Sequence, residues 1–243
     1  MIFSDECYLR DKCWKYHYTD ASCRHNNEYC VKLFKVDYLL SQALIPLQHR
    51  GYMPLRLDAD GTDREQFNEL KNIESNIVEF VEKGTNLFIH SKNCGNGKTQ
   101  WSIRLLQENV NKIWHTSALE CRVLFVSVPQ LLTALKNNIS QTDEYAEHIK
   151  KNISNADLVV FDEIASKAGT SFELEQLLIM INDRIDNGKS NIYTSNVCGV
   201  DLLQSVGDRL YSRIANMSVD IELFGRDKRG LNNDTVTVPK LST

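Results

Sequence analysis

The sequence lacks three features that would assign it to a class at once: a long apolar run, a leader-like N-terminus and an excess of one charge. No apolar run approaches the length of a membrane span, and residues 1–6 have neither the basic nor the apolar region of a signal peptide. We therefore expect a cytoplasmic protein that makes no membrane contact. A formal charge of -4 gives no global electrostatic case for nucleic-acid binding, so such contact would need a local basic patch.

What the sequence does contain is the composition of a folded protein. Of its 243 residues, 42% are apolar and 25% are charged, as in globular domains. This length suits one α/β domain of ordinary size with a small appendage.

A glycine-containing loop between a predicted strand and a predicted helix is the first functional motif. The apolar run 87–90 precedes residues 91–100, and an amphipathic helix follows them. Gly95 and Gly97 allow backbone N–H groups to close around phosphate oxygens, and the helix adds its positive N-terminal end. We expect Lys98 to reach the β and γ phosphates and the Thr99 hydroxyl to bind Mg²⁺. The pattern G-x-x-x-x-G-K-[ST] is met except at its first position, which is Lys92.

Two adjacent carboxylates at the end of an apolar strand form the second motif. Residues 157–163 predict a strand that brings Asp162 and Glu163 to its carboxyl end. We expect Asp162 to hold Mg²⁺ and Glu163 to act as the general base for the attacking water. Two such carboxylates can also begin a surface loop or cap a helix, but their pairing with Lys98 and Thr99 favours a nucleotide site.

The order of strands and helices predicts a doubly wound parallel sheet, with ligands at the carboxyl ends of its strands. We expect helices over residues 31–47, 63–84, 172–185 and 206–214, and strands over 122–127, 191–196 and 219–224. Asp63 is expected to cap its helix. Pro129 is expected to open a further helix.

Four of the seven cysteines lie within the first thirty residues, where aliphatic residues are few. So small a segment cannot bury a sufficient core, and a structural Zn²⁺ site would supply the missing folding energy. The expected zinc ligands are Cys7, Cys13, Cys23 and Cys30, with His17 or His25 as a substitute for one of them. Four reduced, buried cysteines are the alternative, because no C-x-x-C pair is present.

The expected domain organisation follows from this cluster. Residues 1–50 form a zinc-binding domain whose helix over 31–47 packs on the metal site or on a partner. Residues 51–64 form a linker, and residues 65–243 form the ATPase domain.

Three further polar residues are candidates for nucleotide sensing and catalysis. Asn196, which leaves a strand, can reach the γ phosphate or the attacking water. Arg209 and Arg213 share one helix face, since they are four residues apart. They could form salt bridges within the subunit or reach a neighbouring subunit's nucleotide, where an arginine stabilises transition-state charge.

Taken in this order, the motifs over residues 72–229 resemble AAA+ replicative-helicase loaders of the DnaC/DnaI type, especially phage-encoded ones. They include Gly95–Thr99, Phe161–Glu163, Thr194–Asn196 and Asp208–Ile214, followed by Gly225–Arg229. The cysteine-rich N-terminus resembles the small zinc-bearing domain with which these loaders bind the helicase.

The resemblance implies an AAA+ P-loop ATPase in which a parallel sheet is sandwiched by helices, without a C-terminal lid. It assigns Lys98 and Thr99 to Walker A, Asp162 and Glu163 to Walker B, and Asn196 to sensor 1. Arg213 becomes the better candidate for the arginine that acts in trans, and Arg209 supports it or the subunit interface. The residues expected to contact ATP are Asn93, Cys94, Gly95, Asn96, Gly97, Lys98, Thr99, Gln100 and Asp162.

The implied function is ATP-dependent loading of a DnaB-type replicative helicase onto single-stranded DNA in phage or bacterial replication, with self-assembly in the ATP-bound state. DNA contact rests on this analogy alone. An IstB-type transposition ATPase and a helicase-binding adaptor with little turnover are the alternatives. A small-molecule P-loop kinase would need an acceptor pocket and a closing lid, which the sequence does not indicate.

Overall fold

Five short strands form one sheet in the order β2-β3-β4-β1-β5, and every neighbouring pair is parallel. The structure is a computed structural model that describes residues 27–50, 61–137, 142–166 and 169–228. The strands are β1 (Asn86–His90), β2 (Val123–Ser127), β3 (Leu158–Ile164), β4 (Ser190–Ser195) and β5 (Ser218–Glu222). The predicted parallel α/β sheet is therefore confirmed.

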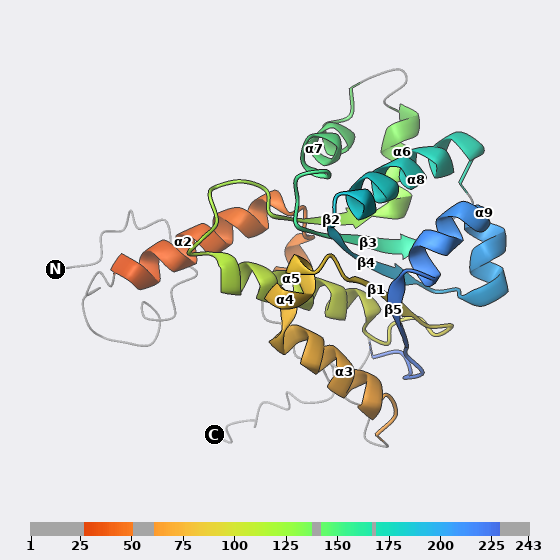
Figure 1. Cartoon of the computed structure of the whole chain (residues 1–243), viewed down its shortest axis with the longest axis horizontal. Helices are drawn as coiled ribbons and strands as arrows, with labels where there is room; N and C mark the ends of the chain where they lie inside the picture. The colour runs from red at the N-terminus through yellow and green to blue at the C-terminus, as the bar shows by residue number, and fades with distance from the viewer. Residues whose placement is uncertain (1–26, 51–60, 138–141, 167–168, 229–243) are drawn as a thin grey trace, which may run out of the picture.

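Helices cover both faces of this sheet (Figure 1). One layer contains α2 (Asn27–Gln42), α3 (Arg64–Ser75), α4 (Ile77–Glu82) and α5 (Lys98–Ile113). The other contains α6 (Val128–Asn137), α7 (Glu144–Asn152), α8 (Ser171–Asp186) and α9 (Gly199–Ala215). Side chains alternate along each strand, so Leu87 and Ile89 belong to the first core and Phe88 to the second. Among the described residues, no helix is both long and apolar enough to cross a membrane.

The helix predicted over residues 31–47 is α2, and its position differs from the prediction. Leu39 of α2, and Ala43 and Ile45 just after it, are buried in the same core as α5 and the sheet. The Phe125 amide on edge strand β2 also donates a 2.7 Å hydrogen bond to the carbonyl of Ala43. Packing on the metal site or on a partner is therefore wrong for the C-terminal part of this helix, whose apolar face covers the sheet.

The single helix predicted over residues 63–84 is two helices, α3 and α4, which meet at Asn76. The Asn76 side-chain amide donates to the carbonyl of Asn72 at 3.0 Å, a local bond that competes with a regular helix. Asp63 does not cap α3 with its side chain. Its buried carboxylate instead accepts hydrogen bonds from the backbone amides of Phe224 (2.7 Å) and Gly225 (2.8 Å), which follow β5.

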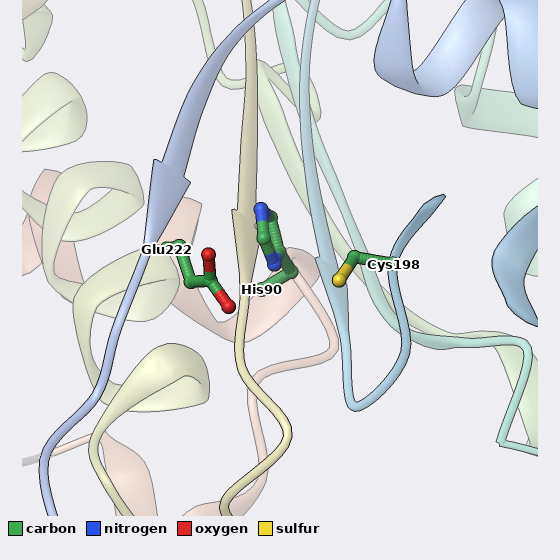
Figure 2. A group of neighbouring side chains, drawn as sticks. All are labelled: His90, Cys198 and Glu222. Carbon is green, nitrogen blue, oxygen red and sulfur yellow. The ribbon is translucent and has the colours of Figure 1, made fainter. Parts of the chain in front are cut away.

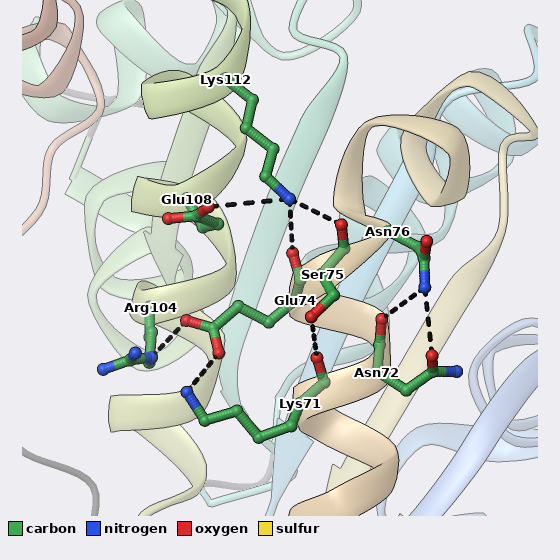
Figure 3. A network of polar contacts seen from close by, with 8 residues as sticks. All are labelled: Lys71, Asn72, Glu74, Ser75, Asn76, Arg104, Glu108 and Lys112. Atoms are coloured by element: carbon green, nitrogen blue, oxygen red, sulfur yellow. Dashed lines mark hydrogen bonds and ion pairs between the residues drawn. The ribbon is translucent and has the colours of Figure 1, made fainter.

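A polar network fastens α3 to α5 (Figure 3). The buried Glu74 carboxylate of α3 accepts from Arg104 of α5 and from Lys71 of its own helix. Lys112 of α5 donates to the carbonyls of Glu74 (3.0 Å) and Ser75 (2.7 Å). These contacts orient α5, and the N-terminus of α5 forms one wall of the site described next.

Candidate active site

The glycine loop connects the end of β1 to the start of α5, as the sequence predicts. Gly95 (φ +72°) and Gly97 (φ +107°) adopt the left-handed conformation that glycine tolerates without strain. The Ser91 hydroxyl fixes the turn, because it accepts from the amide of Asn93 (3.0 Å) and from the side chain of Asn96 (2.6 Å). The loop therefore directs the N-terminal end of α5 toward a cleft.

Lys98 is the first residue of α5 and only 7% of it is exposed. Its ammonium donates to the Asn93 carbonyl (2.9 Å) and to the Asn96 side-chain oxygen (3.2 Å). A buried cation held by neutral oxygens of its own loop can exchange those contacts for phosphate oxygens, which carry full charge.

Asp162 lies where β3 ends, opposite the loop. Its Oδ1 accepts from the Thr99 hydroxyl (2.9 Å) and from the Thr194 hydroxyl (2.6 Å). Burial raises the pKa of Asp162, although the two threonine hydrogen bonds and Lys98 oppose that shift. A buried carboxylate beside a threonine hydroxyl is a hard-oxygen donor pair, so Asp162 and Thr99 fit a Mg²⁺ ion.

Glu163 adopts a positive φ of +60°, which is uncommon for a non-glycine residue. The register between β3 and β4 shifts between Phe161 and Ile164, and a bulge of this kind redirects side chains. The Glu163 amide donates to the Thr194 hydroxyl at 2.9 Å, while its side chain remains exposed. The backbone is thereby held in a sparsely populated conformation that places the Glu163 carboxylate at the cleft.

These groups line one cleft of about 660 Å³, within the range of small-molecule sites. Of the predicted contacts it brings together Cys94, Gly95, Asn96, Gly97, Lys98, Thr99, Gln100, Asp162, Glu163 and Asn196. Asn93 is not among the lining residues, because its side chain donates to the carbonyls of Phe224 and Gly225. The volume, the glycine loop and the buried lysine fit a nucleoside triphosphate.

Several lining residues were not foreseen. Thr194 bridges Asp162 and Glu163, whereas the sequence reading of this strand selected only Asn196. Pro46 and His49 come from the segment after α2, and Ser127 and Gln130 come from β2 and α6. Lys228 reaches the cleft because its amide donates to the Gly95 carbonyl at 2.9 Å. A hydroxyl two residues before Asn196 was the available signal for Thr194; the others depend on packing.

The two predicted arginines are not among the residues that line this cleft. They lie on α9 after Gly207, whose φ of +79° and ψ of 164° interrupt the helix. Arg213 donates to the Asn182 side chain of α8 at 2.7 Å, and Arg209 is exposed. Neither arginine therefore contributes to the cleft of its own subunit.

Most of the predicted zinc ligands, Cys7, Cys13 and Cys23, lie outside the described residues, as do His17 and His25. Cys30 is on α2 and is partly buried. Residues 229–243, which bear on the expected lack of a lid, also lie outside.

Comparison with solved structures finds similar folds in a DnaC helicase loader, in DnaI and in DnaA. A DnaC helicase loader has a TM-score of 0.55 at 20% identity, over 72% of this chain and 95% of that chain. A DnaI structure has a TM-score of 0.58 at 19% identity, over 76% of this chain and 95% of that one. AMPPCP-bound DnaA from Aquifex aeolicus has a TM-score of 0.50 at 20% identity, over 66% of this chain and 46% of that one.

No curated protein sequence matches the chain. The family model described as the bacterial DnaA ATPase domain does match, over residues 67–221. That range is more than half of the chain and contains the glycine loop, Asp162, Glu163, Asn196 and both arginines. This match shows that the chain belongs to the family of the bacterial DnaA ATPase domain.

Proposed function

We propose that the protein is a Mg²⁺-dependent ATPase that loads a DnaB-type replicative helicase onto single-stranded DNA in phage or bacterial replication. The observation that carries the ATPase is the bridge at Asp162, where hydroxyls from the glycine-loop helix and from β4 meet on one carboxylate oxygen. This bridge joins the two nucleotide motifs within one cleft.

Each residue has a role in this proposal. Backbone N–H groups of the loop bind phosphate oxygens, and Lys98 neutralises the β and γ phosphates. Thr99 and Asp162 would hold Mg²⁺, which, when bound, stabilises negative charge on the phosphates. Glu163 accepts a proton from the attacking water as general base. Asn196 positions that water or the γ phosphate.

The supply of an arginine in trans is part of the proposal. Arg213 would stabilise the transition-state charge on a neighbour's nucleotide, and Arg209 would support it or the interface. Arg213 donates from Nε to Asn182 and from Nη1 to the Met217 sulfur (3.3 Å), and since a guanidinium has five N–H groups, others can meet a phosphate. The chain would then assemble when ATP is bound.

The loader assignment is supported by the fold, which spans nearly the whole of a DnaC helicase loader and of DnaI. A similar DnaA structure contains single-stranded DNA, which makes such DNA a proposed partner. We further propose the zinc site of Cys7, Cys13, Cys23 and Cys30 as part of the helicase-binding region. Since α2 belongs to the ATPase core, this region would lie mostly within residues 1–26. A zinc content well below one per chain, in protein purified without chelator, would contradict the site.

The test of the ATPase is Glu163→Gln. The change removes the base and keeps the shape, so hydrolysis should fall about 10²–10⁴-fold while a fluorescent ATP analogue still binds. The matched control is Glu175→Gln, an exposed carboxylate on α8 that should leave turnover unchanged. An unchanged hydrolysis rate in Glu163→Gln would remove Glu163 from the mechanism.

The test of the partner is native mass spectrometry of the chain mixed with a DnaB-type helicase, with and without ATP. The proposal predicts a defined complex that contains both proteins. Assembly on DNA with ATP, without binding to any helicase tried, would instead favour the IstB-type transposition ATPase.

A further inference from the structure

Three metal-binding side chains meet beside the sheet, and none of them lines the nucleotide cleft. His90 is the last residue of β1, Glu222 is the last residue of β5, and Cys198 precedes the first turn of α9. One ligand atom from each lies within 4.8 Å of the other two. Figure 2 shows the imidazole between the thiol and the carboxylate, with one ring nitrogen toward both.

The imidazole of His90 is buried, and one of its ring nitrogens has no hydrogen-bond partner among the described residues. Only 4% of His90 is exposed. Its Nε2 lies 3.0 Å from a carboxylate oxygen of Asp220, whereas Nδ1 is buried without a hydrogen-bond partner in the described part of the chain. Leaving a buried ring nitrogen unpaired costs free energy. Since Nε2 is bonded to Asp220, the nitrogen that faces Cys198 and Glu222 is the unpaired Nδ1.

The local charge favours a cation. Burial raises the pKa of the Cys198 thiol, and the carboxylates of Glu222, Asp220 and Asp201 raise it further, although Lys92 opposes them. A divalent ion bound here would neutralise part of the negative charge that these carboxylates bring to the site. Binding of the ion would then release the thiol proton.

We propose that His90 Nδ1, the Cys198 thiolate and the Glu222 carboxylate bind one Zn²⁺ ion, with water as the fourth ligand. Nitrogen, sulfur and oxygen donors of these types are the ones that zinc takes in proteins. Tetrahedral Zn–S and Zn–N bonds place the two donor atoms roughly 3.5 Å apart, so small side-chain rotations would close the site. Asp220 accepts from Nε2–H, which fixes the tautomer and leaves Nδ1 for the metal.

The site would tie three elements together next to the nucleotide loop. Ser91, which holds the glycine loop, is the residue after His90. Cys198 anchors the start of α9, the helix whose second part carries Arg209 and Arg213. A bound ion would therefore fix the base of the arginine-bearing helix to the carboxyl ends of β1, which leads into the loop, and of its neighbour β5. This inference does not depend on the proposed N-terminal zinc site or on ATP hydrolysis.

The experiment must separate this site from the N-terminal cysteines. The full chain with Cys7, Cys13, Cys23 and Cys30 all changed to serine is freed of metal and titrated with Co²⁺, whose thiolate charge-transfer band reports a bound sulfur. We expect one equivalent of Co²⁺ to bind and Zn²⁺ to displace it. Cys198→Ser in this background should abolish the band and weaken binding at least about 100-fold, and Asp220→Asn should weaken it about 10–100-fold.

Two controls keep the result specific. Cys121→Ser removes a partly buried thiol whose Sγ lies near the carbonyls of Gln42 and Val123, and Cys94→Ser removes the exposed thiol of the glycine loop. Both should keep the band. In the otherwise unchanged chain, native mass spectrometry should show one zinc fewer per protein in Cys198→Ser than in Cys121→Ser. No Co²⁺ binding in the serine background together with equal zinc in these two variants, or a band that survives Cys198→Ser, would overturn the proposal.

Discussion

Two buried charged side chains lie at opposite ends of the strands of the same sheet, and their hydrogen-bond partners differ. At the amino ends of β3 and β4, the fully buried Arg184 donates to the carbonyls of Ile153, Ala156 and Ser190 and to the Asn191 side chain. At the carboxyl ends, both described hydrogen bonds to Asp162 reach the same oxygen, Oδ1, and the residue lines the cleft.

The difference separates a structural charge from a functional one. Burial lowers the pKa of Arg184 to about 10, so the guanidinium remains charged at neutral pH, and four neutral acceptors satisfy it. Asp162 is also buried, but it accepts only two described hydrogen bonds, so it can accept more from the cleft. A buried charge that the protein itself satisfies maintains the fold, whereas one left partly satisfied is available to a ligand.

The largest expected effect on stability comes from replacing Arg184. Arg184→Met should destabilise the chain by about 3–5 kcal/mol, because it leaves several buried acceptors without a donor. Arg184→Lys should recover little, since an ammonium lacks the planar fork that reaches four acceptors. Urea denaturation measures both.

The control at the same edge is Arg122→Met, because Arg122 forms a partly exposed ion pair with Asp157 and should cost less than about 1 kcal/mol. If Arg184→Met and Arg122→Met lowered the free energy of unfolding equally, the buried hydrogen bonds of Arg184 would contribute no more to stability than the partly exposed ion pair.

The bridge at Asp162 is tested through Thr194. Thr194→Val removes the hydroxyl that donates to Asp162 and accepts from the Glu163 amide. If the two hydrogen bonds that position Asp162 and Glu163 stabilise the transition state by about 1.5–3 kcal/mol, their loss should slow ATP hydrolysis about 10–100-fold. Thr194→Ser should restore most of the rate, which a role in packing alone would not predict. A wild-type rate in Thr194→Val would make the bridge dispensable.

The sequence predicted the parts of the site that depend on local order. The motifs, a strand followed by a glycine loop and a helix and then a strand with two carboxylates, predict that Lys98, Thr99, Asp162 and Glu163 lie together, and in the structure these residues line one cleft. These residues lie at strand ends, and the carboxyl ends of parallel strands share one edge. Asn196 reached the cleft for the same reason.

What the sequence did not predict depends on partners distant in the chain. Asp63 is a helix-capping residue by its position, but its acceptor role toward Phe224 arises only when α3 and the end of β5 meet. Arg184 is an ordinary residue in a helical pattern until the turns before β3 and β4 present their carbonyls to it. Likewise, nothing in the spacing of His90, Cys198 and Glu222 indicates that they converge.

Asp63 is a second buried carboxylate near the carboxyl ends of the strands. Unlike Asp162, it is satisfied by two backbone amides. Asp63→Asn keeps one acceptor and places an amide donor against the other N–H group. We expect a loss of about 1–2 kcal/mol in the free energy of unfolding. Glu65→Gln, an exposed carboxylate two residues further on, is the control and should have little effect. A stabilised Asp63→Asn would remove the distinction between satisfied and unsatisfied carboxylates.

In contrast to the other substitutions, Asp162→Asn should stabilise the folded chain, and its effect on stability should be the smallest of the four. Burial raises the pKa of Asp162 in the folded chain, whereas the unfolded chain keeps the ordinary value of about 3.9. Above the folded pKa both states are ionised, and the folded state bears the whole cost of the buried anion. As the pH falls through the folded pKa, the folded state takes up its proton first and the cost is relieved.

Without Mg²⁺ or nucleotide, Asp162→Asn should therefore melt about 2–4 °C higher than the wild type at neutral pH, the shift that about 1 kcal/mol produces at this size. The amide oxygen can still accept from Thr99 and Thr194, so the variant loses the charge and keeps the hydrogen bonds. The gain should shrink as the pH falls through the raised pKa of Asp162 and vanish well below the ordinary value of about 3.9, where the wild-type carboxyl is protonated in both states. Glu120→Gln, which changes an exposed loop carboxylate, is the control and should leave the melting temperature at neutral pH nearly unchanged. With Mg²⁺ and ATP the order should reverse, because ligand binding stabilises only the chain that can hold the ion. A variant less stable than the wild type at neutral pH without ligands would mean that Asp162 is as fully satisfied as Arg184.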